Sequence, residues 1–167
     1  MPKPTPEQID AFEMAPAQIA SAIEGLSEAE MHFIPEIGEW SIHEIVIHLA
    51  DSEVGGYWRL RKTLAERDAT LPAYDQDAWM HNLSYRIQDR RLAMQLFAAL
   101  RASSAALLRL VPEHAWERTS VHPENGEMSV YDLFNLYVDH SNAHLKQIER
   151  LKQSLLLSAP GRRGESI

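Results

Sequence analysis

Apolar residues recur every three or four positions over long stretches of this chain, which is the spacing of an amphipathic α-helix. Proline, glycine and polar runs separate these stretches. We predict four main helices from this pattern, and they cover about residues 5–26, 41–67, 86–111 and 129–157. No set of segments sustains the alternation that is typical of half-buried β-strands. The pattern therefore predicts an all-α protein.

Local signals set the expected helix starts. Ser41 can cap the second helix, and Glu44 three residues later completes a capping box. Ser129 and Asp132 suggest a similar start for the fourth helix. Pro16 lies inside the first helix and is expected to kink or split it. The starts of the second and fourth helices are thus the best defined.

The four helices are expected to pack their apolar stripes around one core, as a four-helix bundle. The third helix would present the stripe Ile87, Leu92, Leu96, Leu100, Leu107 and Leu110. Residues 68–85 form a long crossover between the second and third helices, and a connection of that length can carry function. Residues 1–157 are predicted to be the bundle domain, and residues 158–167 a disordered tail.

Composition limits the chemistry. A chain of 167 residues with 45% hydrophobic residues is the size of one domain with one sizeable core. It contains no cysteine, so a disulfide, a thiolate nucleophile and a thiolate metal site are excluded. Any metal must therefore be held by nitrogen and oxygen ligands.

Charge and hydropathy bear on partners and location. The 16 Lys and Arg against 24 Asp and Glu give a net charge of -8, which repels nucleic acid and anionic lipid. The apolar runs fall short of the roughly 20 residues that cross a bilayer, and the N-terminus has no signal-peptide pattern. We expect no nucleic-acid or membrane partner and a cytoplasmic location.

Two histidines share the apolar stripe of the fourth helix. His140 and His144 lie between Tyr137 and Ile148 at helical spacing, one turn apart, so both imidazoles can face the same ion. The spacing alone is weak evidence, because 8 histidines in 167 residues give about 0.4 such pairs by chance. A polar ring on an apolar stripe must nevertheless find a partner.

His48 occupies an equivalent place between Ile45 and Leu49 on the second helix. If the second and fourth helices are neighbours, all three imidazoles can meet and leave coordination positions open. Neutral imidazole favours zinc, nickel, copper or iron. The alternative is that each ring is a core residue hydrogen-bonded to a carbonyl. The residues alone favour neither the shared metal site nor the separate core histidines.

These motifs resemble the DinB/YfiT-like superfamily over about residues 5–155. The resemblance rests on Trp40-Ser41 at a helix start, on His48-Leu-Ala followed by acidic residues, and on His140-x3-His144. It implies a four-helix bundle, commonly a homodimer, that binds one divalent transition metal, with zinc or nickel favoured. One histidine of the second helix and two of the last would be the ligands, which match His48, His140 and His144.

The resemblance implies two kinds of function. Some relatives are thiol-dependent S-transferases or isomerases and some are described as hydrolases, so the metal would activate a water or a low-molecular-weight thiol toward a small-molecule substrate. The alternative is a non-catalytic metal-binding or structural stress-response bundle, in which the ion only ties two helices together. Three protein ligands plus water would favour the enzyme, and a fourth protein ligand would close the site.

Other residues are weaker candidates. Asp51 follows His48 by one turn and could orient a ligand or act as a base, although a solvated acidic face is the simpler interpretation. Four aromatic residues could line a pocket but are more often core: Tyr57, Trp58, Trp79 and Tyr137. The remaining histidines are expected to be structural or exposed: His32, His43, His81, His114 and His122. The basic run is expected to be a solvated face: Arg59, Arg61 and Lys62.

Overall fold

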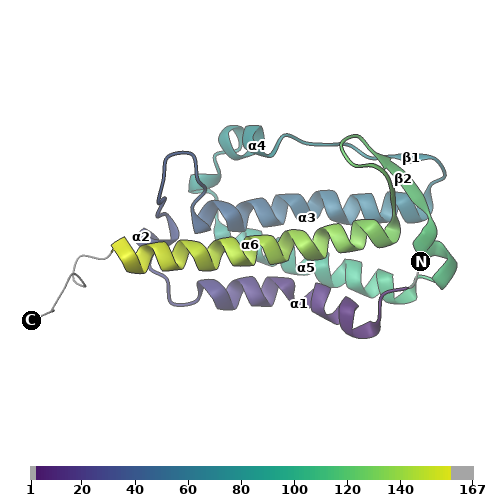
Figure 1. Cartoon of the computed structure of the whole chain (residues 1–167), viewed down its shortest axis with the longest axis horizontal. Coiled ribbons are helices and arrows are strands. Elements are labelled where there is room, and N and C mark those ends of the chain that lie inside the picture. Colours follow the sequence, from purple (N-terminus) through teal and green to yellow (C-terminus); the bar gives the residue numbers. More distant parts are fainter. Residues whose placement is uncertain (1–2, 159–167) are drawn as a thin grey trace, which may run out of the picture.

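The computed structural model describes residues 3–158, and this part of the chain forms a bundle of four long helices that run side by side (Figure 1). The four are α1 (Pro6–Ile23), α3 (Ile42–Ala65), α5 (Arg90–Leu110) and α6 (Val130–Ser158). The predicted all-α four-helix bundle is confirmed, with helix bounds close to those expected. Of the predicted tail only Ser158 is described, and the rest lies outside the described residues.

The order of the helices around the bundle brings α3 next to α6. Both α1 and α3 contact α5 and α6, so α1 lies diagonally opposite α3. His43 at the start of α3 lies 3.2 Å from Arg90 at the start of α5, so these two helices run parallel. The long crossover between them is confirmed, because the chain must return along the bundle before α5 begins (Figure 1).

Short elements occupy the connections. The crossover contains β1 (Ala69–Thr70), α4 (Gln76–Asn82) and the 3-10 turn η1 (Tyr85–Ile87). The short helix α2 (Glu28–Met31) precedes α3, and the 3-10 turn η2 (Glu113–Glu117) follows α5. In Figure 1, α4 and the strands lie on the same side of the bundle, beyond α3. The crossover and the strands therefore lie outside α3, on the side away from α1.

The expected caps fix the starts of the helices that matter for the site. The Ser41 amide donates to the Glu44 carboxylate at 2.8 Å, and the Glu44 amide donates to Ser41 Oγ at 3.2 Å. The Ser129 amide donates to Asp132 at 2.9 Å in the same way. These bonds satisfy amides that the first helical turn leaves without partners. α1 continues through Pro16 as one helix and does not split there.

A small sheet corrects the expectation that strands are absent. β2 (Thr119–His122) pairs antiparallel with β3 (Gly126–Ser129) and parallel with β1. β3 begins directly after the hairpin turn with Gly126 at a φ of 72°, a conformation that glycine adopts without strain. Strands of two and four residues are too short to give a recognisable alternation. The sheet ties the crossover to the start of α6.

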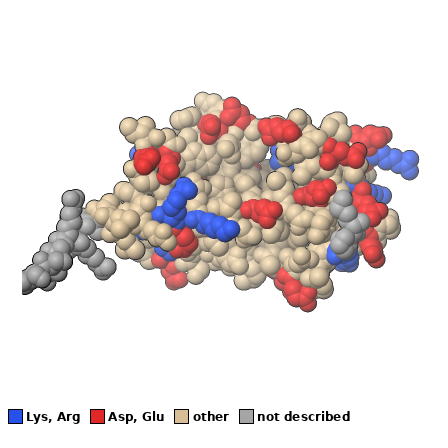
Figure 2. Space-filling model, viewed as in Figure 1, with Lys and Arg blue, Asp and Glu red and all other residues tan. Residues whose placement is uncertain are grey.

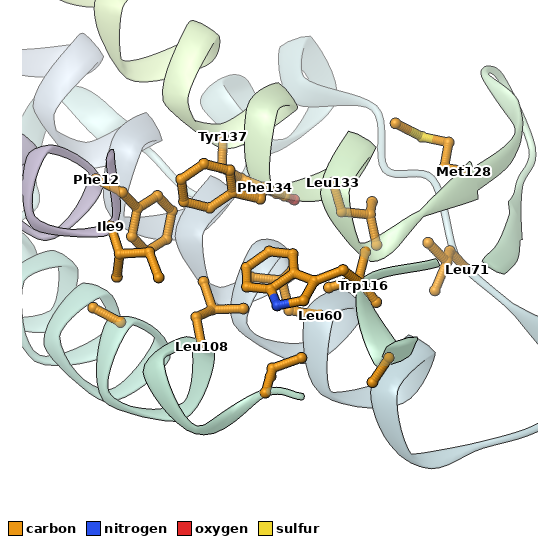
Figure 3. Close-up of a cluster of buried hydrophobic side chains, with 14 residues drawn as sticks. Ile9, Phe12, Leu60, Leu71, Leu108, Trp116, Met128, Leu133, Phe134 and Tyr137 are labelled. Atoms are coloured by element: carbon orange, nitrogen blue, oxygen red, sulfur yellow. The ribbon is translucent and has the colours of Figure 1, made fainter. Parts of the chain in front are cut away.

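The apolar core fills the space between the four helices. Trp116 of η2 is fully buried and meets the Phe134 ring edge-on, with ring centroids 5.9 Å apart. Figure 3 shows this cluster, which draws side chains from every long helix: Ile9, Phe12, Leu60, Leu108, Leu133 and Tyr137. A second cluster lies around Ile19, Ile45, Leu49, Phe97 and Ile148. The core holds α3 and α6 in a fixed register.

The buried face of α5 differs from the predicted stripe. Ile87, Leu92, Leu96 and Leu110 are exposed, whereas the buried residues of α5 are Phe97, Arg101, Ser104, Ala105 and Leu108. The two sets are offset by one residue, or about 100° around the helix. Arg101 is the reason, because it enters the core and pairs with Glu53 at 2.6 Å. A stripe defined by large apolar residues could not include a buried arginine.

Candidate metal centre

The structure brings the three predicted histidines together. His48 lies on α3, and His140 and His144 lie one turn apart on the neighbouring helix α6. His140 Nε2 lies 3.1 Å from His48 Nε2 and 3.1 Å from His144 Nε2. One ligand atom from each ring lies within 4.8 Å of the other two. Three ring nitrogens thus converge on one point between the helices.

The donor set fits a divalent transition metal. Tetrahedral coordination with bonds of about 2.0 to 2.1 Å places ligand nitrogens about 3.3 Å apart, close to the spacing of these rings. A proton on His140 Nε2 can be donated to only one of its two neighbours, whereas a metal ion accepts all three lone pairs. Imidazole nitrogen suits zinc, nickel, copper and iron better than magnesium or calcium. The centre is therefore a possible three-histidine metal site.

Hydrogen bonds and packing orient the rings. His144 Nδ1 lies 2.9 Å from Gln147 Oε1, an atom that only accepts, so Nδ1 carries the proton and Nε2 is left free to bind. The His48 ring meets the edge of Trp40, with ring centroids 4.8 Å apart. His48 Nδ1 is buried without a hydrogen-bond partner in the described residues.

Burial keeps these imidazoles neutral. It lowers the pKa of His48 to about 3, with the charges of His144 and His140 adding to the effect. Burial likewise lowers the pKa of His140 to about 3, and it lowers the pKa of His144. Desolvation disfavours the charged ring, and a metal ligand must be uncharged. The three nitrogens are therefore in the protonation state that a metal requires at neutral pH.

Asp51 is not brought to the histidines. Its carboxylate accepts a hydrogen bond from the Tyr85 hydroxyl at 2.7 Å, and burial raises its pKa. It lines a different cavity of about 250 Å³ on the α5 side of α3, together with Ile47 and Leu92. Its suggested role as a base or ligand-orienting group stays a prediction, without a direct contact to support it.

A cavity of about 730 Å³ opens beside His140. Ser52 and Arg59 of α3 and Tyr137 of α6 form two of its walls, so one of the four candidate aromatic residues does line a pocket. The crossover and the β2–β3 hairpin supply the others, with Tyr74 and His122 among the lining residues. A smaller cavity of about 290 Å³ touches His144 and Trp40. Cavities thus reach the centre from two sides.

Sequence reasoning missed two residues of the large cavity. Arg59 is buried, although it was expected on a solvated basic face. The signal was its spacing, because His48, Ser52 and Arg59 share one stripe of α3. His122 is also buried, on a strand that the sequence did not predict. The other unassigned histidine that proves buried is His43, which donates from Nε2 to the Tyr85 carbonyl at 3.0 Å.

Comparisons with known proteins find relatives over most of the chain. The sequence matches the model of the DinB superfamily over residues 11–148. It is 28% identical to the "Putative metal-dependent hydrolase YfiT" of Bacillus subtilis, over 88% of this chain and 83% of that protein. A protein of the same description from Bacillus licheniformis is 31% identical over 84% of this chain and 81% of its own.

A solved structure shares the fold. The structure of YfiT from Bacillus subtilis superposes with a TM-score of 0.84 at 27% identity, covering 89% of this chain and 86% of that one. It is described as a probable metal-dependent hydrolase with an unusual four-helix bundle topology.

Proposed function

This chain belongs to the DinB superfamily, and we propose that it is a metal-dependent enzyme whose His48, His140 and His144 hold one zinc or nickel ion. The observation that carries the proposal is the convergence of three neutral imidazole nitrogens at the edge of a large cavity. The descriptions of the relatives as metal-dependent hydrolases support it.

The chemistry of the proposal follows from an open coordination sphere. A bound ion would lower the pKa of a water or thiol and so supply a nucleophile at neutral pH. Within residues 3–158 no fourth His, Asp or Glu joins the cluster, which favours an open site over a closed structural one. A thiol nucleophile would have to come from a low-molecular-weight cosubstrate, because the chain has no cysteine.

The protein's own groups would position the reaction. Gln147 fixes the His144 ring with its Nε2 toward the other two rings. Burial raises the pKa of Tyr137 to about 12, so its hydroxyl remains protonated and can donate a hydrogen bond into the cavity beside His140. Hydrolysis of a small molecule and transfer of a small thiol are the two reactions that this arrangement suits.

Metal content tests the site. We expect the wild type to bind about one zinc or nickel ion per chain after chelation and reloading, measured by plasma mass spectrometry or titration calorimetry. His140→Ala and His144→Ala each leave two ligands and should lose most of this binding. His114→Ala is the matched control, because His114 is exposed on η2 and away from the centre. Stoichiometric binding in both site variants would contradict the proposal.

Activity assays separate the enzyme from the structural alternative. The metal-loaded protein would be incubated with ester and amide substrates alone, and with an electrophile plus a low-molecular-weight thiol. Turnover that disappears on chelation and returns with metal supports an enzyme, and the reacting partner distinguishes hydrolase from transferase. A metal-loaded protein inactive in both assays, whose metal only raises the melting temperature, would favour the structural bundle.

Assembly and location complete the proposal. We propose a homodimer in the cytoplasm that acts on a small molecule and not on nucleic acid. Acidic side chains are spread over the face shown in Figure 2, in keeping with the net charge of -8. Among residues 3–158, no helix combines the length and apolarity that a membrane span needs.

A further inference from the structure

The large cavity beside the metal centre contains a buried arginine that has no counter-ion among residues 3–158. Arg59 is 6% exposed and lines the cavity from α3. Its Nη1 donates to the Tyr137 hydroxyl and its Nη2 to the Pro72 carbonyl, both at 2.7 Å. None of the ion pairs within residues 3–158 includes Arg59, and its Nε has no acceptor there. Within this part of the chain both of its side-chain hydrogen bonds are to uncharged groups, so no carboxylate there compensates its positive charge.

A second buried arginine, Arg101, shows how the fold compensates such a charge. Arg101 is 1% exposed, and its Nε donates to the Glu53 carboxylate at 2.6 Å. Its remaining nitrogens donate to the Phe12 and Tyr137 carbonyls and to Ser141 Oγ. A buried charge is normally paired in this way. Among residues 3–158, Arg59 has no carboxylate of this kind, and its side chain borders the cavity instead.

Two further hydrogen-bond donors face the same cavity. The Tyr137 hydroxyl accepts from Arg59 and stays protonated, so its own hydrogen is available to another acceptor. His122 Nδ1 accepts from the Glu124 and Asn125 amides, both at 3.3 Å, which places the ring proton on Nε2. Arg59, Tyr137 and His122 thus offer donors from three different elements to one volume.

Glycines on α3 make room for this arrangement. A Cβ at Gly56 would lie 2.6 Å from the Tyr137 ring, so only glycine allows α6 to bring that ring so close. A Cβ at Gly55 would lie 3.7 Å from Arg59 Nη1, which is ordinary contact. The Tyr137 hydroxyl reaches the guanidinium because the backbone of α3 carries no side chain at Gly56.

Acidic residues at the rim do not neutralise the arginine. Asp75 lines the cavity, but its carboxylate accepts the Asp77 and Ala78 amides at the start of α4. Glu124 also lines the cavity and is exposed on the hairpin. Neither forms an ion pair with Arg59.

We propose that this cavity binds an oxyanion of the substrate, a carboxylate or a phosphate group, on Arg59 with the Tyr137 hydroxyl and His122 Nε2. Guanidinium groups bind such planar or tetrahedral oxyanions by charge-assisted hydrogen bonds. The Tyr137 and His140 ring centroids are 6.5 Å apart, so the rest of the substrate extends toward the three histidines. The anion site is independent of the metal, and only the direction in which the reacting group extends rests on the proposed function.

Anion titration of the full chain tests the proposal. Succinate and inorganic phosphate are titrated separately and followed by the backbone amide NMR signals of Glu124 and Asn125, which bond to His122. We expect saturable shifts with at least one anion, and the anion that binds distinguishes carboxylate from phosphate recognition. Arg59→Gln should weaken binding at least about tenfold, as expected for the loss of a charged hydrogen-bond donor. An absence of saturable shifts with either anion would overturn the proposal.

Three further variants separate this site from its surroundings. Arg61→Gln removes the same charge two residues away, on the side of α3 that contacts Ser103 and Ser104, and should bind the anion like the wild type.

Tyr137→Phe keeps the ring and loses only the hydroxyl, so it should weaken binding even if Arg59→Gln fails to fold. His144→Ala should lose metal and retain the anion, because His144 lies outside this cavity. If His144→Ala abolishes anion binding and Arg59→Gln does not, the anion binds at the metal and the inference is refuted.

Discussion

At the scale of single residues, the molecule contains a buried neutral histidine that makes its stability depend on pH. His43 donates from Nε2 to the Tyr85 carbonyl and accepts at Nδ1 from Arg90 Nη1, and the second bond requires the uncharged ring because protonation would occupy Nδ1. Burial, with a contribution from His32, lowers the pKa of His43 below its usual value. The folded state therefore resists protonation of this ring.

The sign of the pH effect follows from linkage. Below about pH 6.5 the unfolded chain binds a proton at residue 43 that the folded chain does not bind, so the free energy of unfolding falls as pH falls. We expect urea denaturation with chelator present to show lower stability at about pH 5.5 than at about pH 7.5. His43→Gln should show a smaller decline. An identical decline in the variant would contradict this role of His43.

The buried Arg101–Glu53 pair gives a second prediction at this scale. Both side chains are almost fully enclosed, so Glu53→Gln leaves a buried charge without its partner. We expect this change to reduce the free energy of unfolding by about 3 kcal/mol or more in urea denaturation.

The matched control is Arg109, which lies on α5, the helix that also carries Arg101. Arg109 pairs with Asp10 and Glu13 at the surface, and Arg109→Gln should reduce stability much less than Glu53→Gln, because exposed ion pairs contribute little. Comparable losses for Glu53→Gln and Arg109→Gln would argue that burial does not set the strength of the Arg101–Glu53 pair.

At the scale of elements, the close contact of α3 with α6 depends on Gly56. A Cβ there would meet the Tyr137 ring at 2.6 Å, so Gly56→Ala must push the two helices apart or displace the ring. We expect lower stability and weaker zinc binding, because this contact joins α3, which carries His48, to α6, which carries His140 and His144. Melting curves and zinc titration measure both effects.

The neighbouring glycine provides the comparison. A Cβ at Gly55 would have Arg59 Nη1 as its nearest neighbour, at 3.7 Å, which is ordinary van der Waals distance. Gly55→Ala should therefore keep zinc binding and increase the free energy of unfolding by about 0.4 to 1 kcal/mol, through the lower entropy of the unfolded chain. Equal zinc affinity in the two variants would show that helix spacing does not control the centre.

At the scale of the whole molecule, apolar side chains remain exposed on α3 and α5. Val54 and Trp58 on α3 and Leu92 and Leu96 on α5 are each more than two-fifths exposed. Exposed apolar surface of this kind is typical of an interface. We expect a homodimer by light scattering and dissociation toward monomer in Trp58→Glu, with Trp79→Glu on α4 as control. A wild-type monomer at high protein concentration would reject the dimer.

Much of the fold was determined by local sequence. The positions of the four helices follow from apolar periodicity, and hydrogen bonds within four residues fix the starts at Ser41 and Ser129. The histidines could be recognised for the same reason, because helical spacing alone places His140 and His144 on one face. The position of His48 between Ile45 and Leu49 suggested it as the third ligand, and the family resemblance favoured this interpretation over separate core roles. His48 lies 92 residues from His140.

Only the tertiary structure decided the features that depend on contacts between distant segments. The pairing of Ala69 with Ser120 forms a sheet from strands too short to show a pattern. The ion pair with Glu53 stabilises Arg101 in the core, on a side of α5 that its large apolar residues do not mark. Arg59 is buried because the crossover supplies the Pro72 carbonyl and α6 the Tyr137 hydroxyl. Periodicity reports which side of a helix is apolar, whereas a buried charge is stabilised by particular partners, and those partners are known only when the chain has folded.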